Sequence, residues 1–383
     1  MARFVFACDS FKGTISSRRA AELLVHSARV RFPAVSCTCV QVADGGEGTV
    51  DAVVAATDGE FIHVAVSDPL GRSVCAHYGM LPEGRAVIEM AAASGLPLLV
   101  PDERNPLATS SYGTGQLIAD ALARGATDVS IAIGGSATND AGMGCMRALG
   151  ARFLDADGED LAGVGSDLGR VESIDVSGMD GLLGRARFHV MCDVDNPLVG
   201  PRGATRVFAP QKGARPAVVR ELEDGMASFA DVLARTFGVD VSQEPGMGAA
   251  GGLAAAARLF LSAEVVSGVD WVLDLVGLTA ALEGADLCIT GEGHADSQSS
   301  HGKVVSGVST RCRAAGVTCV AIVGGMDPGA LGLLSQGVDA LVPTAIGAGS
   351  VADALSHAER NFALAADRTF SLLALGRGMG ECS

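Results

Sequence analysis

The sequence predicts an α/β protein in which a doubly wound parallel sheet of the flavodoxin or Rossmann type is interrupted by a second, inserted α/β domain with a mixed sheet. Two observations carry this prediction: strand and helix patterns alternate at both ends of the 383-residue chain, and antiparallel patterns occupy its middle. Composition is a third, because 51 glycines and only 4% aromatic residues suit a fold of small aliphatic side chains and tight turns.

The N-terminal region begins the alternation of strands and helices. Residues 3–8 form a short apolar run typical of a buried strand, and a helix capped at 16–17 is expected to extend to about Arg31. An alternating run at 37–42 predicts a second strand, followed by a helix rich in Ala and Val that ends near residue 56.

The pattern changes after residue 60. Residues 61–67, 73–80 and 85–90 predict three strands joined by short turns, which is typical of an antiparallel meander. Further elements are expected as a helix at 114–124, strands at 129–133 and 187–192, and helices at 216–237 and 250–261.

The first pattern returns near the C-terminus. Strands are expected at 286–290, 317–323 and 338–342, with helices at 303–315, 328–335 and 350–372. Together with the two N-terminal strands they give five strands of a doubly wound sheet. We therefore predict a discontinuous domain formed by 1–60 and 265–383, an inserted domain at 61–264, and an active site in the cleft between the two domains.

Charge and hydrophobicity exclude several classes of function. The net charge is −16, whereas a protein that binds nucleic-acid phosphates needs a basic surface, so nucleic acid is excluded as a partner. No signal peptide and no run of 18 apolar residues occurs, so we expect a cytoplasmic protein with no membrane partner. Ten cysteines lack metal-ligand spacing and are interpreted as reduced thiols, several of them in the core.

Lysine is rare in this chain. Of 28 basic residues only Lys12, Lys212 and Lys303 are lysines, and each of them stands next to a glycine. A compact ammonium group at a phosphate site cannot be replaced by a guanidinium without loss. The three lysines are therefore candidate ligands of an anion, the alternative being chance retention at the surface.

Acidic, glycine-rich turns follow the first two predicted strands. Asp9, Ser10 and Lys12 stand together after the first, and Asp44 opens the stretch 44–48 after the second. Because parallel strands place ligands at their carboxyl ends, these groups suit a metal–phosphate or hydroxy-acid site. The alternatives are a capped helix start with a solvated lysine, and an ordinary helix N-cap at the second position.

The third strand of the same domain is expected to end in a further polar cluster. Glu292, His294, Asp296 and Lys303 fall within about a dozen residues, and they form a strong catalytic candidate. Zinc is a weak interpretation, because His294 and His301 lack a third ligand at suitable spacing.

A Gly-Gly-Ser loop after the strand at 129–133 is the leading candidate for anion binding. Its donors would be the backbone of Gly134 and Gly135 and the side chains of Ser136, Thr138 and Asn139. The loop matches neither a Walker A motif nor a dinucleotide fingerprint.

Two carboxylates follow the strand at 187–192. Asp193 and Asp195 would share one face if the strand continued, and Mg²⁺ is commonly held by one or two carboxylates together with phosphates. The alternative is a polar turn preceding Asn196-Pro197. Lys212 lies in a nearby glycine-containing segment.

These stretches occur in one order along almost the whole chain. They are DSFKG at 9–13, ADGGEGT at 43–49, YGTGQLI at 112–118, IGGSATNDAGMG at 133–144, CDVDNPLVGPRGA at 192–204, FAPQKGA at 208–214, GAAGGL at 248–253 and TGEG at 290–293. As an ordered set they resemble the bacterial type 1 glycerate kinase family, which are glycerate 2-kinases. The resemblance implies ATP-dependent phosphorylation of D-glycerate with Mg²⁺, on the 2-hydroxyl to give 2-phosphoglycerate and ADP.

The chain departs from the family pattern after TGEG. His294 stands where the family has arginine, and the family's Asp-x-Gln-Thr is Asp296 to Ser299 here. Arginine binds carboxylates and phosphates through two parallel hydrogen bonds, whereas histidine is charged only part of the time near neutral pH.

The resemblance suggests roles for the polar residues. Asp195 or Asp296 would orient or deprotonate the glycerate hydroxyl, and the other acids together with Asp193, and with Asp44 as a further candidate, would hold Mg²⁺. The three lysines would bind the glycerate carboxylate or the nucleotide phosphates, with Lys12 also in a catalytic role. Replacing either candidate base by Asn should lower kcat strongly while leaving the fold intact.

Other functions remain open from the sequence. A glycerate 3-kinase, or a kinase of a related small hydroxy acid, would use the same groups. A metabolite-sensing regulator could keep the fold without catalysis, and a nicotinamide or flavin enzyme could use the sheet, although the dinucleotide fingerprint is missing. A homodimer is compatible with the sequence.

Overall fold

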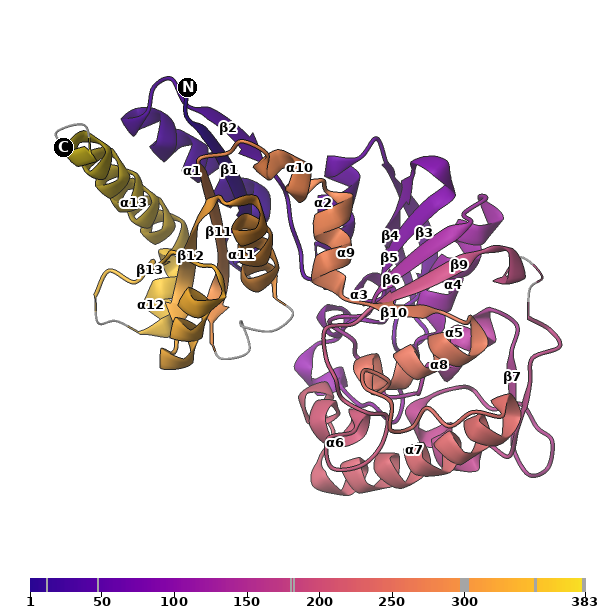
Figure 1. The fold of residues 1–383 in the computed structure, drawn as a ribbon. Helices are drawn as coiled ribbons and strands as arrows, with labels where there is room; N and C mark the ends of the chain where they lie inside the picture. The colour runs from indigo at the N-terminus through magenta and orange to yellow at the C-terminus, as the bar shows by residue number, and fades with distance from the viewer. Residues whose placement is uncertain are drawn as a thin grey trace. The chain divides into compact units, whose positions relative to one another are not determined.

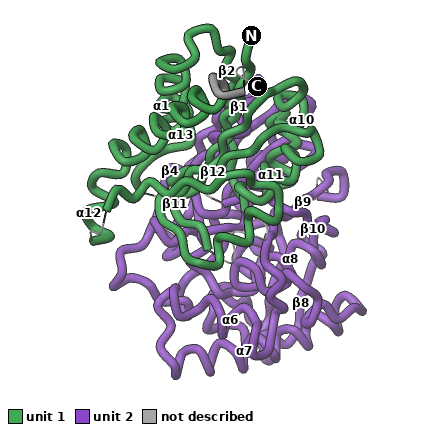
Figure 2. Tube along the Cα trace, turned by 60° about the vertical axis from the view of Figure 1, so that its left-hand side comes forward, with its two compact units in different colours: residues 1–44, 269–383 green, residues 45–268 purple. Residues whose placement is uncertain are grey.

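The computed structural model describes residues 1–11, 13–46, 48–179, 181, 183–296, 303–347 and 350–380 (Figure 1). The chain divides into two compact units, called unit 1 (residues 1–44 and 269–383) and unit 2 (residues 45–268) (Figure 2). The division falls earlier than the boundary expected near residue 60. Helix α2 (Thr49–Ala56) belongs to unit 2 because it packs against the strands β4 and β5 of that unit.

Unit 1 contains a five-stranded parallel sheet with the order β13-β12-β11-β1-β2. Its strands are β1 (Arg3–Cys8), β2 (Ser36–Cys39), β11 (Leu287–Ala295), β12 (Thr318–Met326) and β13 (Ala340–Pro343). All five were predicted, and the order confirms a flavodoxin-like doubly wound sheet. The chain winds in opposite directions from β1, so the carboxyl ends of β1 and β11 form the topological switch point where such sheets bind ligands.

Helices cover both faces of this sheet. They are α1 (Ser17–Arg31), α9 (Gly268–Leu275), α10 (Leu278–Leu282), α11 (Val304–Ala315), α12 (Val351–Ser356) and α13 (Ala358–Gly380). Side chains alternate along β1: Phe4 and Phe6 lie in the core that includes Phe370 of α13, and Val5 lies in the opposite core beneath α9 and α11. Helix α1 starts at the predicted cap, because the Ser16 hydroxyl accepts a hydrogen bond from the Arg19 N–H.

Strand β11 is longer than the sequence predicted. It was expected to end at residue 290, but it continues to Ala295 in register with β12. Glycine makes this pairing possible, since a Cβ at Gly291 would lie 2.2 Å from the Ile322 carbonyl oxygen. The Gly-Glu-Gly-His segment is therefore part of the strand, and its side chains alternate between the two faces of the sheet.

Several other predicted elements of unit 1 differ in length or type. The single helix expected at 350–372 is two helices, α12 and α13, and β12 extends to Met326 instead of ending at residue 323. Strand β2 ends at Cys39, three residues before the expected end. The helix expected at 328–335 is a 3₁₀ segment over Pro328–Gln336.

Unit 2 contains a six-stranded mixed sheet with the order β10-β9-β6-β5-β4-β3. Its strands are β3 (Glu60–Ser67), β4 (Ser73–Leu81), β5 (Arg85–Glu89), β6 (Asp128–Ala132), β9 (Arg187–Met191) and β10 (Glu264–Val266). The first three pair antiparallel, which confirms the meander, and β5, β6, β9 and β10 run parallel. The carboxyl ends of β6 and β9 therefore meet at the same edge of the sheet.

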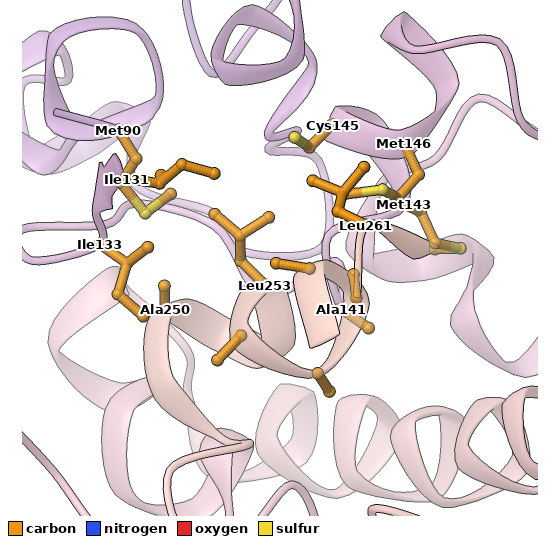
Figure 3. Close-up of a cluster of buried hydrophobic side chains, with 14 of the residues drawn as sticks. Met90, Ile131, Ile133, Ala141, Met143, Cys145, Met146, Ala250, Leu253 and Leu261 are labelled. Atoms are coloured by element: carbon orange, nitrogen blue, oxygen red, sulfur yellow. The ribbon is translucent and has the colours of Figure 1, made fainter. Parts of the chain in front are cut away.

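The helices of unit 2 enclose its main hydrophobic core. Besides α2 they are α3 (Ala91–Ser94), α4 (Tyr112–Ala123), α5 (Met143–Ala148), α6 (Ala204–Phe208), α7 (Pro216–Phe237) and α8 (Leu253–Phe260), and a small sheet pairs β7 (Arg152–Leu154) with β8 (Ser173–Asp175). Figure 3 shows part of this core, where Ile131 of β6, Met143 of α5 and Leu253 of α8 come together. The Gly-Gly-Ser loop connects β6 to α5, two elements that contribute side chains to this core.

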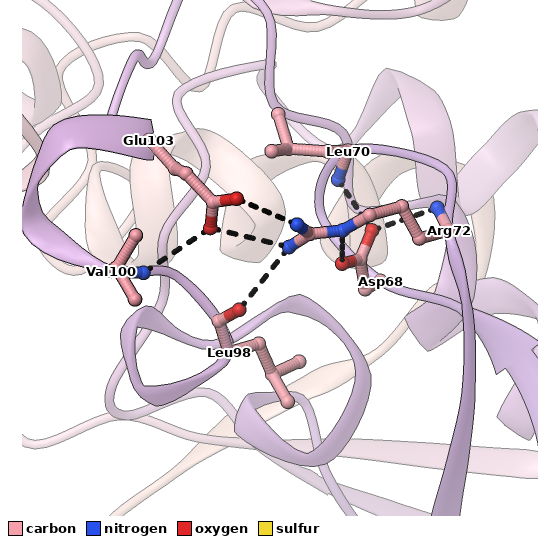
Figure 4. Close-up of polar contacts among 6 residues, drawn as sticks. All are labelled: Asp68, Leu70, Arg72, Leu98, Val100 and Glu103. Carbon is pink, nitrogen blue, oxygen red and sulfur yellow. Dashed lines mark hydrogen bonds and ion pairs between the residues drawn. The ribbon is translucent and has the colours of Figure 1, made fainter.

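The turn between β3 and β4 is fixed by a buried carboxylate (Figure 4). Asp68 accepts hydrogen bonds from the Leu70 N–H (2.8 Å) and from the Nε of Arg72 (2.6 Å). The guanidinium of Arg72 also contacts Glu103 at 2.7 Å and thereby ties the turn to the segment after α3. A carboxylate that accepts several hydrogen bonds from the backbone and from an arginine can fix the conformation of a turn that contains no helix or strand.

The two ends of unit 2 are in direct contact. A Cβ at Gly45, the first residue of the unit, would lie 3.0 Å from the Cα of Gly268, its last residue. Gly45 also has a positive φ of 78°, so glycine is required there for both reasons.

No helix in the described ranges combines the length and hydrophobicity needed to cross a lipid bilayer. The nine cysteines among these residues are free thiols.

Candidate active site

A pocket of about 750 Å³ in unit 1 lies at the predicted switch point. Most of its polar lining comes from the loops after β1 and β2, from β11 and from the start of α11: Asp9, Ser10, Asp44, Glu292, His294, Asp296 and Lys303. Its apolar lining includes Phe11, Ile15, Met326, Val351, Leu355 and Phe362. The fold thus brings together seven of the residues that the sequence singled out. Lys12, which was expected beside them, lies outside the described residues.

Lys303 joins two of the pocket carboxylates. Its Nζ lies 3.4 Å from Oδ1 of Asp296 and 3.7 Å from Oε2 of Glu292. Glu292 is buried on β11, Asp296 follows the end of that strand, and Lys303 is the N-cap residue of α11. These two ion pairs place the ammonium group beside both carboxylates in the pocket lining.

The loop after β1 is fastened to the neighbouring strand. The Asp9 N–H donates to the Gly291 carbonyl of β11 at 2.9 Å, and the Ser10 N–H donates to Oδ1 of Asp9 at 2.6 Å. The Asp9 side chain is almost buried and lines the pocket. The backbone of this loop thus places the Asp9 carboxylate in the lining of the pocket.

His294 lies at the same pocket but is partly solvent-exposed. It is paired with Gly325 of β12 in the sheet register, and its Nε2 is 3.5 Å from Oδ2 of Asp327. The imidazole can donate a hydrogen bond to an anion there, but it supplies a full positive charge only when protonated.

The Gly-Gly-Ser loop of unit 2 is closely packed against other glycine-rich segments. A Cβ at Gly134 would lie 2.9 Å from the Cα of Gly46, and one at Gly251, where φ is +67°, would lie 2.2 Å from the Thr138 carbonyl oxygen. The side chain of Asn139 donates to the hydroxyl of Thr205 at 3.1 Å. Three motifs far apart in the sequence therefore meet at one loop, which explains why each contains glycine.

Lys212 is a structural partner of this loop. Its side chain is buried, and its Nζ donates to the Ser136 hydroxyl and to the Thr138 carbonyl, both at 2.7 Å. Burial lowers the pKa of the ammonium group to about 7, although the nearby Asp140 carboxylate acts in the opposite direction. Lys212 was expected to bind a ligand, but in the structure its ammonium group is hydrogen-bonded to the Gly-Gly-Ser loop.

Sequence reasoning did not assign a role to Asp140, which anchors the same loop. Its carboxylate accepts hydrogen bonds from the N–H and hydroxyl of Ser111, both at 2.7 Å, and from the N–H groups of Gly142 and Gly144 at 3.2 and 3.3 Å. Burial raises its pKa, and these hydrogen bonds act against that rise. The sequence carried a signal for this role, since Asp140 stands directly before the glycine-rich start of a helix.

Asp140→Asn is expected to lower the free energy of unfolding by about 2–4 kcal/mol, because an amide nitrogen would face N–H donors that the carboxylate now accepts. Urea denaturation at neutral pH measures the change. Asp157→Asn, at an exposed turn of the same unit, is the matched control and should cost under about 0.5 kcal/mol. Equal stability of the two variants would contradict the anchoring role.

Asp193 and Asp195 are not aligned on one strand face. Strand β9 ends at Met191, and Asp193 Oδ1 accepts a hydrogen bond from the Gly268 N–H at 3.0 Å. The Asp195 side chain is 73% exposed and lies 2.6 Å from Arg202, which holds the pKa of that carboxyl below its usual range. Within the described residues, no cluster of three or more His, Cys, Asp or Glu is arranged to hold a metal ion.

Comparisons with known proteins are consistent along nearly the whole chain. A model of the Glycerate kinase family matches residues 4–374. The chain is 42% identical over 375 residues to glycerate 2-kinase of Escherichia coli (strain K12), with 98% of each chain covered. It is 44% identical over 357 residues to glycerate kinase of Bacillus subtilis (strain 168), covering 93% of this chain and 94% of the relative. A crystal structure from Salmonella typhimurium LT2, provisionally assigned as glycerate kinase 2, has a TM-score of 0.86 and 42% identity, covering 98% of this chain and 99% of that one.

Proposed function

The chain belongs to the glycerate kinase family and is a kinase, and on that premise we propose that it transfers the γ-phosphoryl group of ATP to the 2-hydroxyl of D-glycerate, giving 2-phosphoglycerate and ADP. The position of transfer is supported by the relative from Escherichia coli, which is named a glycerate 2-kinase. The observation that carries the proposal is the pocket at the switch point of unit 1, where carboxylates and a lysine converge.

The donor set of the pocket fits Mg²⁺ better than it fits a nucleotide alone. Asp9, Asp44, Glu292 and Asp296 outnumber the described lysine, Lys303, so a polyphosphate would meet a net negative surface. Mg²⁺ takes oxygen ligands and is commonly bound by one or two carboxylates plus phosphates. When bound, it would neutralise phosphate charge, and Asp9 and Asp44 are the residues we propose to hold it. Metal binding by Asp193 and Asp195 stays a prediction.

Asp296 is the proposed acceptor of the hydroxyl proton. As the glycerate oxygen attacks, its bond to phosphorus forms, the bond from phosphorus to the bridging oxygen of ADP breaks, and the hydroxyl proton passes to the carboxylate. Lys303 next to it would bind phosphate or the substrate carboxylate. The position of Asp296 in the pocket supports it over Asp195, whose carboxylate is exposed and bound to Arg202.

The Gly-Gly-Ser loop is the second proposed anion site. Ser136, Thr138 and the backbone of Gly134 and Gly135 would bind a phosphate or the glycerate carboxylate. The Thr138 hydroxyl supports this role, since it is buried and has no hydrogen-bond partner among the described residues. An unpaired buried hydroxyl is costly, and an anionic ligand would relieve that cost.

A coupled assay of ADP release tests the proposed activity. Purified protein with ATP, Mg²⁺ and D-glycerate should release ADP at a rate that depends on D-glycerate, and L-glycerate is the matched control for stereochemistry. NMR of the product distinguishes 2-phosphoglycerate from the 3-isomer. Release of ADP that is independent of glycerate would overturn the substrate assignment, and 3-phosphoglycerate would overturn the position of transfer.

A further inference from the structure

One helical face forms the apolar wall of the unit 1 pocket. Val351, Ala354, Leu355 and Ala358 all line it, and their spacing of three, one and three residues places them on one side of α12 and the start of α13. This face is open: the exposed fraction of Val351 is 76% and that of Leu355 is 54%. In Figure 1, α12 is the short helix labelled near β13.

The pocket therefore has two chemically different ends. Carboxylates and Lys303 come from the carboxyl ends of β1, β2 and β11 and from the start of α11, whereas Val351, Ala354 and Leu355 come from α12, which follows the edge strand β13. A volume of about 750 Å³ is within the range of small-ligand sites, which are mostly apolar with a few polar groups that fix orientation. A ligand that fills both ends must carry a part that these carboxylates bind through Mg²⁺ or that binds Lys303, and an apolar part.

Asn361 adds a hydrogen-bonding group to the apolar end. It lies one helical turn beyond Ala358, lines the pocket, and makes no side-chain hydrogen bond within the described residues. A carboxamide presents a donor and an acceptor side by side. Adenine offers the complementary pair, an amino group next to a ring nitrogen, and asparagine recognises this edge in other complexes.

We propose that the apolar end of this pocket is the nucleobase subsite for ATP and ADP, with the base lying against Val351 and Leu355 and its edge bonded by Asn361. The inference rests on the proposed function only in requiring a nucleotide as phosphoryl donor. It adds the location of the base and a residue that determines nucleotide specificity.

Calorimetric titration of the full-length protein with Mg²⁺ and ADP tests the apolar wall. Leu355→Gln should raise the Kd of ADP at least about tenfold, since a polar amide replaces the apolar contact with the base. The Kd of inorganic tripolyphosphate, which has no base, should stay within about twofold of the wild-type value. Leu372→Gln is the matched control, because Leu372 is 70% exposed on α13 but does not line the pocket.

The specificity residue has its own test. Asn361→Asp removes the donor from the side chain and leaves only acceptors, which suits the two neighbouring N–H donors on the guanine edge. The ratio of the Kd for ADP to that for GDP should therefore move at least about tenfold toward GDP. Asn361→Ala should weaken ADP binding without creating a preference for GDP.

Several outcomes would overturn the inference. They are an ADP affinity unchanged by Leu355→Gln, an equal loss of ADP and tripolyphosphate affinity in that variant, and a nucleotide preference unchanged by Asn361→Asp. Circular dichroism and Tm of each variant identify misfolding, and the tripolyphosphate titration serves as an internal control for it. ADP binding does not require glycerate, so a wild-type protein that binds ADP here without phosphorylating glycerate would contradict the proposed function and leave this inference standing.

Discussion

Replacing Asp296 by Asn is expected to lower kcat for glycerate phosphorylation by about 10²–10⁴-fold, the usual contribution of a positioned acid or base. Asp296 lines the pocket at the switch point, with Lys303 3.4 Å away. The substitution keeps the shape of the side chain and removes its ability to accept the hydroxyl proton. The KM for ATP should change much less than kcat, because the amide still fills the same space. The coupled ADP assay measures both constants.

Asp195→Asn separates the two carboxylates that the sequence left as alternatives. Asp195 is exposed and bound to Arg202, so its loss should change kcat far less than the loss of Asp296 if the pocket of unit 1 holds the base. A large effect of Asp195→Asn together with a small effect of Asp296→Asn would reverse the assignment. Full activity of both variants would remove both residues from the mechanism.

Lys212→Met is expected to reduce kcat/KM by about 10²–10³-fold, the range seen when a preorganised donor is lost. Methionine has a similar length but cannot donate hydrogen bonds. The Nζ of Lys212 donates to the Ser136 hydroxyl and to the Thr138 carbonyl, each at 2.7 Å. The loop would lose its fixed geometry rather than a contact to substrate. A double-mutant cycle with Ser136→Ala checks this, because two residues acting through one hydrogen bond give strongly non-additive effects.

The same variant gives a prediction on the pH dependence of stability. Lys212 has an ordinary pKa of 10.5 and a pKa of about 7 in the folded protein, so between these values the unfolded chain holds more protons. The free energy of unfolding of the wild type, relative to Lys212→Met, should therefore rise with pH by about 1.4 kcal/mol per unit from pH 7 to 10. Below pH 7 the difference should level off. Urea titrations at several pH values measure it, and a flat difference across this window would show that the buried group does not titrate as described.

The sequence predicted most elements of the fold because their patterns are local. Residues 4–8 are apolar throughout, and the serines before the first helix supply its cap, so the first strand and the first helix could both be placed. The end of β11 could not, because Gly291 and Glu292 have low strand propensity on their own. Their strand geometry depends on pairing with β12, which is a tertiary effect that overrides local preference.

The candidate site was predictable where residues follow strand ends. Asp9, Asp44 and Asp296 all follow predicted strands, and parallel strands bring their carboxyl ends to one edge of a sheet, so their common place in the lining of one pocket could be expected. The burial of Lys212 was not predictable, since a lysine beside glycine looks the same in sequence whether it faces solvent or a loop interior. The exposure of Asp195 was not predictable for a related reason: the sequence left open whether the strand expected at 187–192 continues, and β9 ends at Met191. The placement of the active site between the two units stays a prediction.

The contact between Gly45 and Gly268 also bears on how this architecture could have arisen. A segment whose first and last residues touch can be inserted at a single point of another domain without stretching either chain. Unit 2 therefore meets the geometric requirement for insertion as one block into a connection of unit 1. The β2–α9 connection of unit 1 is the point at which unit 2 interrupts the five-stranded sheet.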